Sequence, residues 1–545
     1  YTHSHSEYDA TSPCTKNSLP MLGPACFRHG PLPSPTQRLW WQPLLLGALL
    51  VVNSGCQASA QAPLHWPVPT PPALRAEDPV LWVALAARLG PMAPGVGADS
   101  PLVLRPASGS LTLEDGAGQS ITAPEVTLHW RWQPLPQPFK ARRRVVGPFA
   151  SYETAEAAAR SWAASGHQPV IARPTEWEVW APADAPDPPG RPAKLVERTA
   201  GQRLDLEIRR PQGTLVLQSP LRVKAPGGLR WVNGTYRGPF RLIPDAHGGW
   251  SLLEEVPLER YLEGVVPHEI GAGSPAAALG AQAVLARTWA VRNRGRYQVD
   301  GYHLCADTQC QVYSDPGVAG PAVRQAIGGS RGQVLAQGGL PIHAVYHASN
   351  GGVAAGLEEA WGVDPVPYLR PFADGLPGFQ DRTPLPVSPK TLSALLRNGQ
   401  GAFGADHPLF RWQRTLTAPG IKTALAARGL TVGTPSALKV LERGGSGRVV
   451  ALEIVGSKTT LVLRRDAIRR TFRQLPSTLF TVSPALPGSW LVEGGGFGHG
   501  VGLSQAGAID LARRGWAMDS ILKHYYPGAS LQPLEALSLL GKPGD

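Results

Sequence analysis

The stretch SPAAALGAQAVLARTWAVRNRG, residues 274–295, is the strongest helix signal in the sequence, and it follows a long series of strand-like segments. Ser274 is a typical N-cap residue, and Pro275 suits the first helical position. The apolar stripe of this helix consists of Leu279, Ala283, Ala286 and Ala290. Strands followed by a helix of this kind predict an α+β fold.

The segments before this helix, over residues 200–256, are short and alternating and are separated by tight turns. Such spacing is typical of an antiparallel sheet. Downstream, helical patterns over 389–397 and 505–514 alternate with the strand-like segments RVVALEIV and TTLVLRR. We therefore expect a domain over residues 200–535 that is rich in antiparallel sheet and contains a few helices, followed by a tail at 536–545.

The region before this domain predicts smaller units. Residues 63–138 are rich in Pro and Ala and indicate a linker with short strands. Residues 139–182 follow a strand–helix–strand–strand pattern, with Ser151 to cap the helix and Gly166 to end it. This pattern resembles part of a SPOR-type repeat, which binds denuded glycan strands. A small module that only packs against its neighbours is the alternative. A linker rich in Pro and Asp is expected over 183–199.

The N-terminal residues predict export. Residues 1–37 are polar and rich in Pro, which indicates a disordered or non-native leader. Residues 38–62 contain a basic flank, the short apolar run LWWQPLLLGALLVV and then small residues, as a secretory signal does. A retained membrane anchor and a lipid on Cys56 are the alternatives. In each case we expect the protein in the periplasm or cell envelope.

The net charge of +12 suits nucleic acid, an anionic membrane surface or an acidic cell-wall polymer. The sequence has no long run of Lys and Arg and no nucleic-acid-binding motif. We expect no nucleic-acid partner, and membrane contact only through the signal anchor or a lipid.

The densest cluster of glycines is GGGFGHGVGLSQAGA, residues 494–508. It matches neither a dinucleotide-binding fingerprint nor a P-loop. In a strand, the alternation of Gly498 and Gly500 would leave one face without side chains, so that a backbone or a ligand could lie against it. Ser504 can cap the following helix, and Gln505 offers a donor and an acceptor. His499 is either structural or part of a site.

Glu269 is the candidate acid. It follows the apolar residues Val265 and Val266 and precedes a glycine-bearing turn. A glutamate placed there can be partly buried, with its pKa raised, and can then protonate a departing glycosidic oxygen. A turn glutamate that faces water is the alternative.

Several motifs occur in an order that resembles the SpoIID/LytB family of bacterial cell-wall proteins. They are VPLERYLEGVVPHEI, AQAVLARTWAV, YHLCADTQCQVY, YHASNGG, YLRPF, RVVALEIVG, LPSTLF, GGGFGHGVGLSQAGA and HYYPGASL. The resemblance covers about residues 240–535. It implies a lytic transglycosylase that cleaves the bond between N-acetylmuramic acid and N-acetylglucosamine. The products carry 1,6-anhydro ends, and strands stripped of stem peptides are preferred.

The resemblance also implies roles for individual residues and partners. Glu269 takes the position of the catalytic acid/base. The substrate-binding residues would be His499, Ser504, Gln505, Gly498 and Gly500. Ser349 and Asn350, in the YHASNGG turn, could hydrogen-bond sugar, and a turn that satisfies its own hydrogen bonds is the alternative. Glycan strands are the implied substrate, and a cell-wall amidase is an implied partner. A non-catalytic amidase enhancer of the LytB type and a glycan-binding scaffold remain the alternatives.

The sequence departs from the family pattern around Cys305 and Cys310. Some SpoIID proteins hold zinc near this motif with two cysteines and two histidines, but Gln309 stands where one histidine is expected. His303 is the remaining candidate ligand, so the set falls short of four. No cofactor is required for the implied reaction. A Cys305–Cys310 disulfide is the alternative to zinc.

Overall fold

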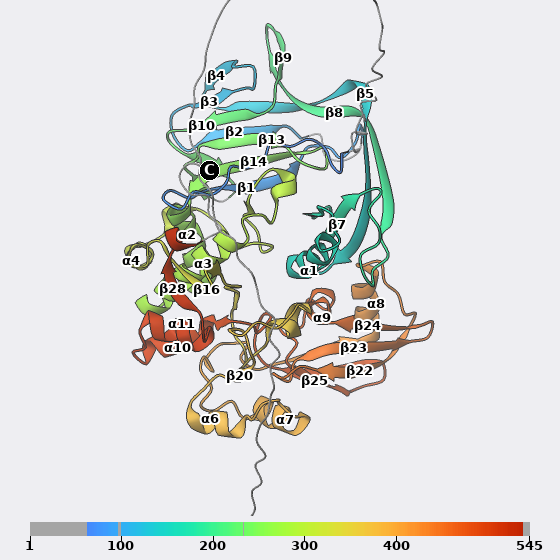
Figure 1. Ribbon diagram of the computed structural model, residues 1–545, viewed down its shortest axis with the longest axis vertical. Helices are drawn as coiled ribbons and strands as arrows, with labels where there is room; N and C mark the ends of the chain where they lie inside the picture. The colour runs from blue at the N-terminus through green and yellow to red at the C-terminus, as the bar shows by residue number, and fades with distance from the viewer. Residues whose placement is uncertain (1–62, 96–99, 233, 538–545) are drawn as a thin grey trace, which may run out of the picture. The chain divides into compact units, whose positions relative to one another are not determined.

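The computed structural model describes residues 63–95, 100–232 and 234–537, which belong to one compact unit. The expected leader, secretory signal and Cys56 lie outside the described residues. The described residues are 24% helix and 36% strand with several antiparallel sheets, which confirms the α+β class (Figure 1). Within the described residues, no helix has the length and apolar character needed to cross a membrane.

A seven-stranded sheet forms the first layer, in the order β15-β1-β14-β13-β10-β3-β4. Its strands are β1 (Val80–Leu89), β3 (Leu111–Glu114), β4 (Ser120–Ala123), β10 (Leu221–Lys224), β13 (Phe240–Pro244), β14 (Trp250–Pro257) and β15 (Leu304–Cys305). β1 pairs antiparallel with β14 along most of its length. The region expected to be a linker with short strands therefore contains a strand of ten residues that pairs with a neighbour on each side.

A second sheet is built on the long antiparallel pair β5 (Val126–Phe149) and β8 (Lys194–Arg210). Its other strands are β2 (Leu102–Pro106), β6 (Val170–Ala172), β7 (Trp177–Pro182), β9 (Gly213–Leu217), β11 (Leu229–Trp231) and β12 (Gly234–Tyr236). The expected boundaries at 138/139 and 199/200 fall inside β5 and β8. They do not separate folded units, because the pairing of β5 with β8 runs through both.

The strand–helix–strand–strand order expected for residues 139–182 is present. The helix is α1 (Tyr152–Ala163), and the Ser151 side chain accepts a hydrogen bond from the backbone N–H of Thr154. Gly166 follows the helix with a left-handed φ of 84°, so both ends agree with the sequence. The resemblance of this segment to a SPOR-type repeat stays a prediction.

The strongest expected helix is α3 (Ala276–Arg292), but two details of the prediction were wrong. Its side chains are buried from Ala278 to Val291 on every face, because α2 (Leu258–Val266), α4 (Pro321–Gly329), α10 (Gln505–Arg513) and α11 (Met518–Tyr525) pack around it (Figure 1). Ser274 does not cap the helix. Its hydroxyl donates to the carbonyl of Ile270, and Pro275 takes the N-cap position.

The remaining elements are short. The two other expected helices, α7 (Pro389–Arg397) and α10, are confirmed, and the Ser504 side chain caps α10 as predicted. The strands are β16 (Gln333–Gln337), β17 (Leu340–Pro341), β18 (Tyr346–His347), β19 (Val353–Ala354), β20 (Phe372–Ala373), β21 (Trp412–Thr417), β22 (Pro435–Arg443), β23 (Val449–Gly456), β24 (Thr460–Arg464), β25 (Phe480–Pro484), β26 (Ser489–Gly494), β27 (Leu503–Ser504) and β28 (Ser530–Pro533). The helices are α5 (Leu357–Trp361), α6 (Pro377–Arg382), α8 (Ala418–Ala426) and α9 (Asp466–Thr471).

Candidate active site

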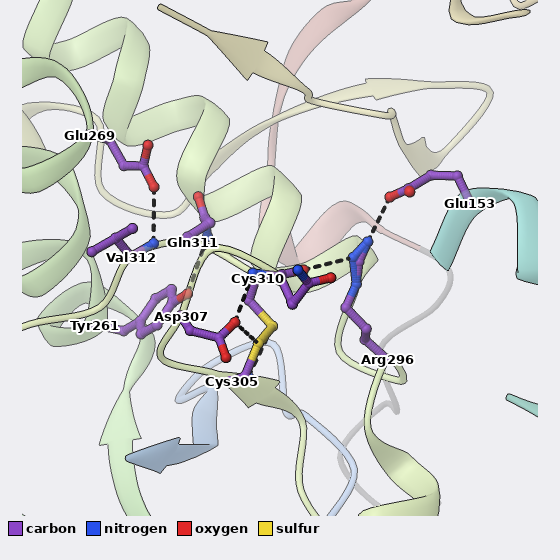
Figure 2. Close-up of a disulfide and its surroundings, with 10 residues drawn as sticks. Glu153, Tyr261, Glu269, Arg296, Cys305, Asp307, Cys310, Gln311 and Val312 are labelled. Atoms are coloured by element: carbon purple, nitrogen blue, oxygen red, sulfur yellow. Dashed lines mark hydrogen bonds and ion pairs between the residues drawn. A yellow bond between two sulfur atoms is a disulfide. The ribbon is translucent and has the colours of Figure 1, made fainter. Parts of the chain in front are cut away.

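Glu269 lies in a turn of π-helix, Pro267–Gly271, between α2 and α3. Its side chain is partly buried, and its Oε1 accepts a hydrogen bond of 3.0 Å from the backbone N–H of Val312 (Figure 2). Burial raises the pKa of Glu269 above the usual value, and the hydrogen bond from Val312 offsets only part of that rise. The carboxyl group is therefore suited to remain protonated and to donate a proton.

A buried network fixes the groups next to this carboxyl. The hydroxyl of Tyr346 donates to Oε1 of Gln311 at 2.8 Å, and Nε2 of Gln311 donates to the hydroxyl of Tyr261 at 3.3 Å. Tyr346 also lies within hydrogen-bonding reach of Glu269. The interaction with Tyr346 lowers the pKa of Glu269, as the hydrogen bond from Val312 does, and offsets part of the rise that burial causes.

The segment that binds the Glu269 carboxyl through Val312 comes immediately after a disulfide in the sequence. Cys305 and Cys310 are bonded, with their Cα atoms 5.7 Å apart, and Gln311 and Val312 continue from Cys310 (Figure 2). Inside the bridged loop, the side chain of Asp307 accepts a hydrogen bond from the backbone N–H of Gln309. The disulfide therefore anchors the segment that presents the N–H of Val312 to Glu269.

The zinc alternative does not fit these residues. The sulfur atoms of Cys305 and Cys310 are bonded to each other and are not free thiolates. Nδ1 of His303 accepts from the backbone N–H of Trp82 at 2.8 Å, and Nε2 lies 2.9 Å from the carbonyl of Pro72. Burial lowers the pKa of His303 to about 4. The disulfide alternative is the one present, and both nitrogens of His303 are engaged in backbone contacts.

Glu269 lines two cavities. The first, which we call the arginine cavity, has a volume of about 270 Å³, and its wall includes Glu269, Tyr346, Trp361, Arg469, Arg470 and His499. The second, which we call the α10 cavity, has a volume of about 320 Å³, and its wall includes Glu269, Asp406, His407, Gln505, Asp510 and Arg513. A substrate that filled both cavities would pass over the Glu269 carboxyl.

Ion pairs line the arginine cavity. Arg296 pairs with Glu153 of α1 at 2.6 Å (Figure 2). The carboxylate of Asp466 receives Arg469 at 3.0 Å and Arg470 at 2.6 Å. Burial by itself would raise the pKa of Asp466, but the two guanidinium groups outweigh it and hold the pKa below its usual range. Both neighbouring carboxylates are therefore ionised and paired, in contrast to Glu269.

His499 lines the arginine cavity but already uses both ring nitrogens. Nδ1 accepts from the backbone N–H of Val501 at 3.1 Å, so Nε2 carries the proton that it donates to the carbonyl of Tyr346 at 2.9 Å. The ring packs against Trp361, with centroids 4.9 Å apart. Burial lowers the pKa of His499 to about 4. The ring of His499 is therefore neutral, and it helps to position Tyr346 through the hydrogen bond to the Tyr346 carbonyl.

Of the two occupants considered for the glycine cluster, a backbone or a ligand, the structure has the protein's own atoms against Gly498 and Gly500. A Cβ on Gly500 would lie 2.3 Å from the Arg448 guanidinium, and one on Gly498 would lie 2.7 Å from Cβ of His347. Both glycines have left-handed φ values, 83° and 109°, which a strand does not have. The cluster is a loop folded tightly against the protein's own residues.

The other predicted substrate-binding residues are mostly enclosed. Ser349 accepts from the N–H of Gly351, and Asn350 donates to Asp374 at 2.6 Å. Ser504 is buried as the cap of α10, so these three residues do not line either cavity. Gln505 does line the α10 cavity, where its Nε2 donates to Gln282.

Sequence reasoning missed several residues of the site. Tyr346 and Gln311 stand inside quoted motifs, but nothing in the residues alone distinguishes them from structural positions. The pairing of Asp466 with Arg469 and Arg470 has a helical i, i+3 and i, i+4 spacing that could have been found.

A larger cavity, of about 1020 Å³, lies beside β5 and β8 and is lined by Trp66, Phe139 and Arg203 among others. Its acidic residue, Asp205, pairs with Arg203 at 3.0 Å. It therefore offers no carboxyl group comparable to Glu269, and we assign the chemistry to the smaller cavities.

Residues 246–336, which include Glu269, match the family described as Stage II sporulation protein (SpoIID). Residues 355–502, which include Arg469, Arg470 and His499, match a family described as Domain of unknown function (DUF8618). The arginine cavity thus takes Glu269 and Arg296 from one matched region and Arg469 and Arg470 from the other, and Glu153 on α1 belongs to neither.

Proteins of known name cover about half of the chain. Stage II sporulation protein D of Bacillus subtilis is 27% identical over 306 residues, which cover 52% of this chain and 77% of that protein. The same protein of Bacillus amyloliquefaciens is 29% identical over 53% of this chain and 78% of its own length. The amidase enhancer of Bacillus subtilis is 30% identical over 50% of this chain and 40% of its own length. The match over residues 246–336 and these similarities support the SpoIID/LytB family for this part of the chain.

Proposed function

We propose that the protein is a lytic transglycosylase of peptidoglycan and that Glu269 is its catalytic acid/base. The similarity to the SpoIID/LytB family supports a role related to the cell wall. The observation that carries the finer proposal is the placement of Glu269, a partly buried carboxyl group with a raised pKa that lines two cavities. A glycan strand laid across both cavities would present a glycosidic oxygen to this acid.

In the proposed reaction, Glu269 protonates the oxygen that links N-acetylmuramic acid to N-acetylglucosamine, and the bond from C1 of muramic acid to that oxygen breaks. The C6 hydroxyl of the same muramic acid attacks C1 and loses its proton to the Glu269 carboxylate, which restores the acid. The products are a 1,6-anhydro end and a new N-acetylglucosamine end. No water is consumed, so a second free carboxylate is not needed to activate water.

The surroundings of Glu269 suit this sequence of steps. The N–H of Val312 can stabilise the carboxylate after it has given up its proton, and Tyr346 also lowers the pKa of this carboxyl group. Glu153 and Asp466, the other carboxylates of the arginine cavity, are held in ion pairs with arginines. Neither is free to serve as a second base.

The second candidate is a non-catalytic amidase enhancer, which would bind glycan and stimulate a cell-wall amidase. The similarity to the amidase enhancer of Bacillus subtilis favours it. In that case Glu269 would be a binding residue, and the amidase would be the partner that acts on the wall.

The test compares the full chain with its Glu269→Gln variant on glycan strands with and without stem peptides, with products read by mass spectrometry. Anhydro ends from the wild type alone would support the transglycosylase. Intact glycan from both proteins, with strand binding retained and a stimulated amidase, would favour the enhancer.

A further inference from the structure

The arginine cavity carries an unmatched positive charge when Glu269 is protonated. The positive charge of Arg296 is neutralised by its ion pair with Glu153, and the Arg296 side chain is only 4% exposed. Arg469 and Arg470 instead share the single carboxylate of Asp466. The neutral ring of His499 adds no charge to the cavity. One cationic group beside the catalytic acid is therefore available to an anion.

The two guanidinium groups that share Asp466 are also accessible. Their side chains are 30% and 28% exposed, whereas Asp466 beneath them is 7% exposed. Arg470 reaches Asp466 through Nε, and its two terminal nitrogens make no hydrogen bond to any residue in the described ranges. A buried carboxylate thus orients Arg470 and leaves the donor edge of its guanidinium free. A free guanidinium edge matches the two oxygens of a carboxylate.

We propose that Arg469 and Arg470 bind the carboxylate of the lactyl ether of N-acetylmuramic acid and so seat this sugar in the arginine cavity. The inference rests on the proposed function, because it assumes that muramic acid lies beside Glu269. The lactyl group is attached to the same ring whose C1 bond would be cleaved, so it stays within the cavity that holds the reacting carbon. When a stem peptide is attached, this carboxylate becomes a neutral amide and the charge is lost.

The α10 cavity supports the same orientation of the strand. Its wall carries the carboxylates of Asp406 and Asp510 against one arginine, Arg513, so it does not attract an anion. Asp510 also accepts the N–H of Gly404 and pairs with Arg514. N-acetylglucosamine has no charge and suits this cavity. The strand therefore runs with muramic acid at Arg469 and Arg470 and with the departing sugar at α10.

The substrate test uses peptide-stripped glycan strands in two forms, with lactyl carboxylates free or converted to methylamides. We expect the wild-type full chain to cleave the free form with a kcat/KM at least about tenfold higher, because a charge-assisted hydrogen bond is lost on amidation. Most of the change should lie in KM. Equal cleavage of both forms would overturn the inference and leave the proposed function intact.

The variant test assigns the preference to the two arginines. An Arg469→Gln/Arg470→Gln double variant should cleave the two forms with a ratio near one. Arg473→Gln, which removes the same type of charge from an exposed residue outside both cavities, should keep the wild-type ratio. A double variant that folds and keeps the preference would contradict the assignment.

Binding by the Glu269→Gln variant separates the two proposals if no cleavage is seen. Its affinity for the free and amidated strands is measured by co-sedimentation or fluorescence. A preference for the free form that disappears when Arg469 and Arg470 are also replaced would uphold the anion site even if the transglycosylase proposal fails. Equal affinity for both forms would reject the anion site.

Discussion

Two loops lie near Glu269, and their composition is a poor guide to which of them contacts its carboxyl group. The glycine-rich loop over 494–502 is the most conspicuous stretch of the sequence, yet its glycines pack against Arg448, His347 and neighbouring backbone. The loop over 305–312 is less conspicuous, yet it ends in the Val312 N–H that binds the Glu269 carboxyl. A dense cluster of glycines indicates that other atoms approach the backbone closely, and here those atoms belong to the protein itself.

The largest expected effect concerns the acid that the 305–312 loop holds. Glu269→Gln should lower the rate of glycan cleavage by about a thousandfold, because a general acid contributes roughly that much. The melting temperature should change little, since the replacement keeps the side-chain volume. Glu263→Gln, on α2 and outside both cavities, is the matched control and should retain activity. Substantial cleavage by the Glu269 variant would remove Glu269 from the mechanism.

The next prediction tests whether the glycine loop is structural. Gly500→Ala should destabilise the protein by about 3 kcal/mol, because left-handed strain and overpacking against Arg448 add up. Gly515→Ala has a similar φ of 87° but open space around its Cβ, so it should cost about 1–2 kcal/mol. Denaturant unfolding measures both. Equal losses would show that packing of the glycine loop adds nothing beyond backbone strain.

A smaller effect is expected at the disulfide. A Cys305→Ser/Cys310→Ser variant should lose about 2 kcal/mol of unfolding free energy, as a short bridged loop predicts. Cleavage should fall several-fold in addition, because Gln311 and Val312 are no longer anchored. A variant with Cys14, Cys26 and Cys56 changed to Ser keeps the bridge and serves as the control. Unchanged kcat in the double variant would contradict the positioning role of the 305–312 loop.

The pH dependence is the subtlest prediction. A general acid works in its protonated form, so kcat/KM should fall as pH rises through the pKa of Glu269. Because burial raises that pKa, the fall should lie above the value of about 4.3 expected for an ordinary glutamic acid. A pH profile on stripped strands measures it. A rate that increases with pH across this range would mean that Glu269 acts first as a base.

Much of the fold could be predicted from local patterns. Hydrophobic alternation located the strands of 200–256, helical patterns located α7 and α10, and capping residues supported α1 and α10, because these signals are local. β1 was missed because its surroundings are rich in Pro and Ala, and its strand character depends on pairing with β14. The boundaries at 138/139 and 199/200 failed for the same reason, since β5 pairs with β8 across them.

The site was less predictable than the fold. Apolar neighbours and the following turn suggested the partial burial of Glu269, and the structure has it. The enclosure of Ser349, Asn350 and Ser504 depends on contacts distant in sequence, which composition does not encode. The same is true of the Tyr346–Gln311–Tyr261 network, whose members come from three separate elements.

The most direct test of the account is the origin of the oxygen at the new glycan end. Peptide-stripped strands are incubated with the full chain in water labelled with heavy oxygen, and the products are read by mass spectrometry. We expect anhydro-muramic ends that contain no label, because the C6 hydroxyl supplies the attacking oxygen and Glu269 supplies the proton. Labelled reducing ends would contradict this expectation, and they would point to hydrolysis with an exposed carboxylate such as Asp406 as the base for water.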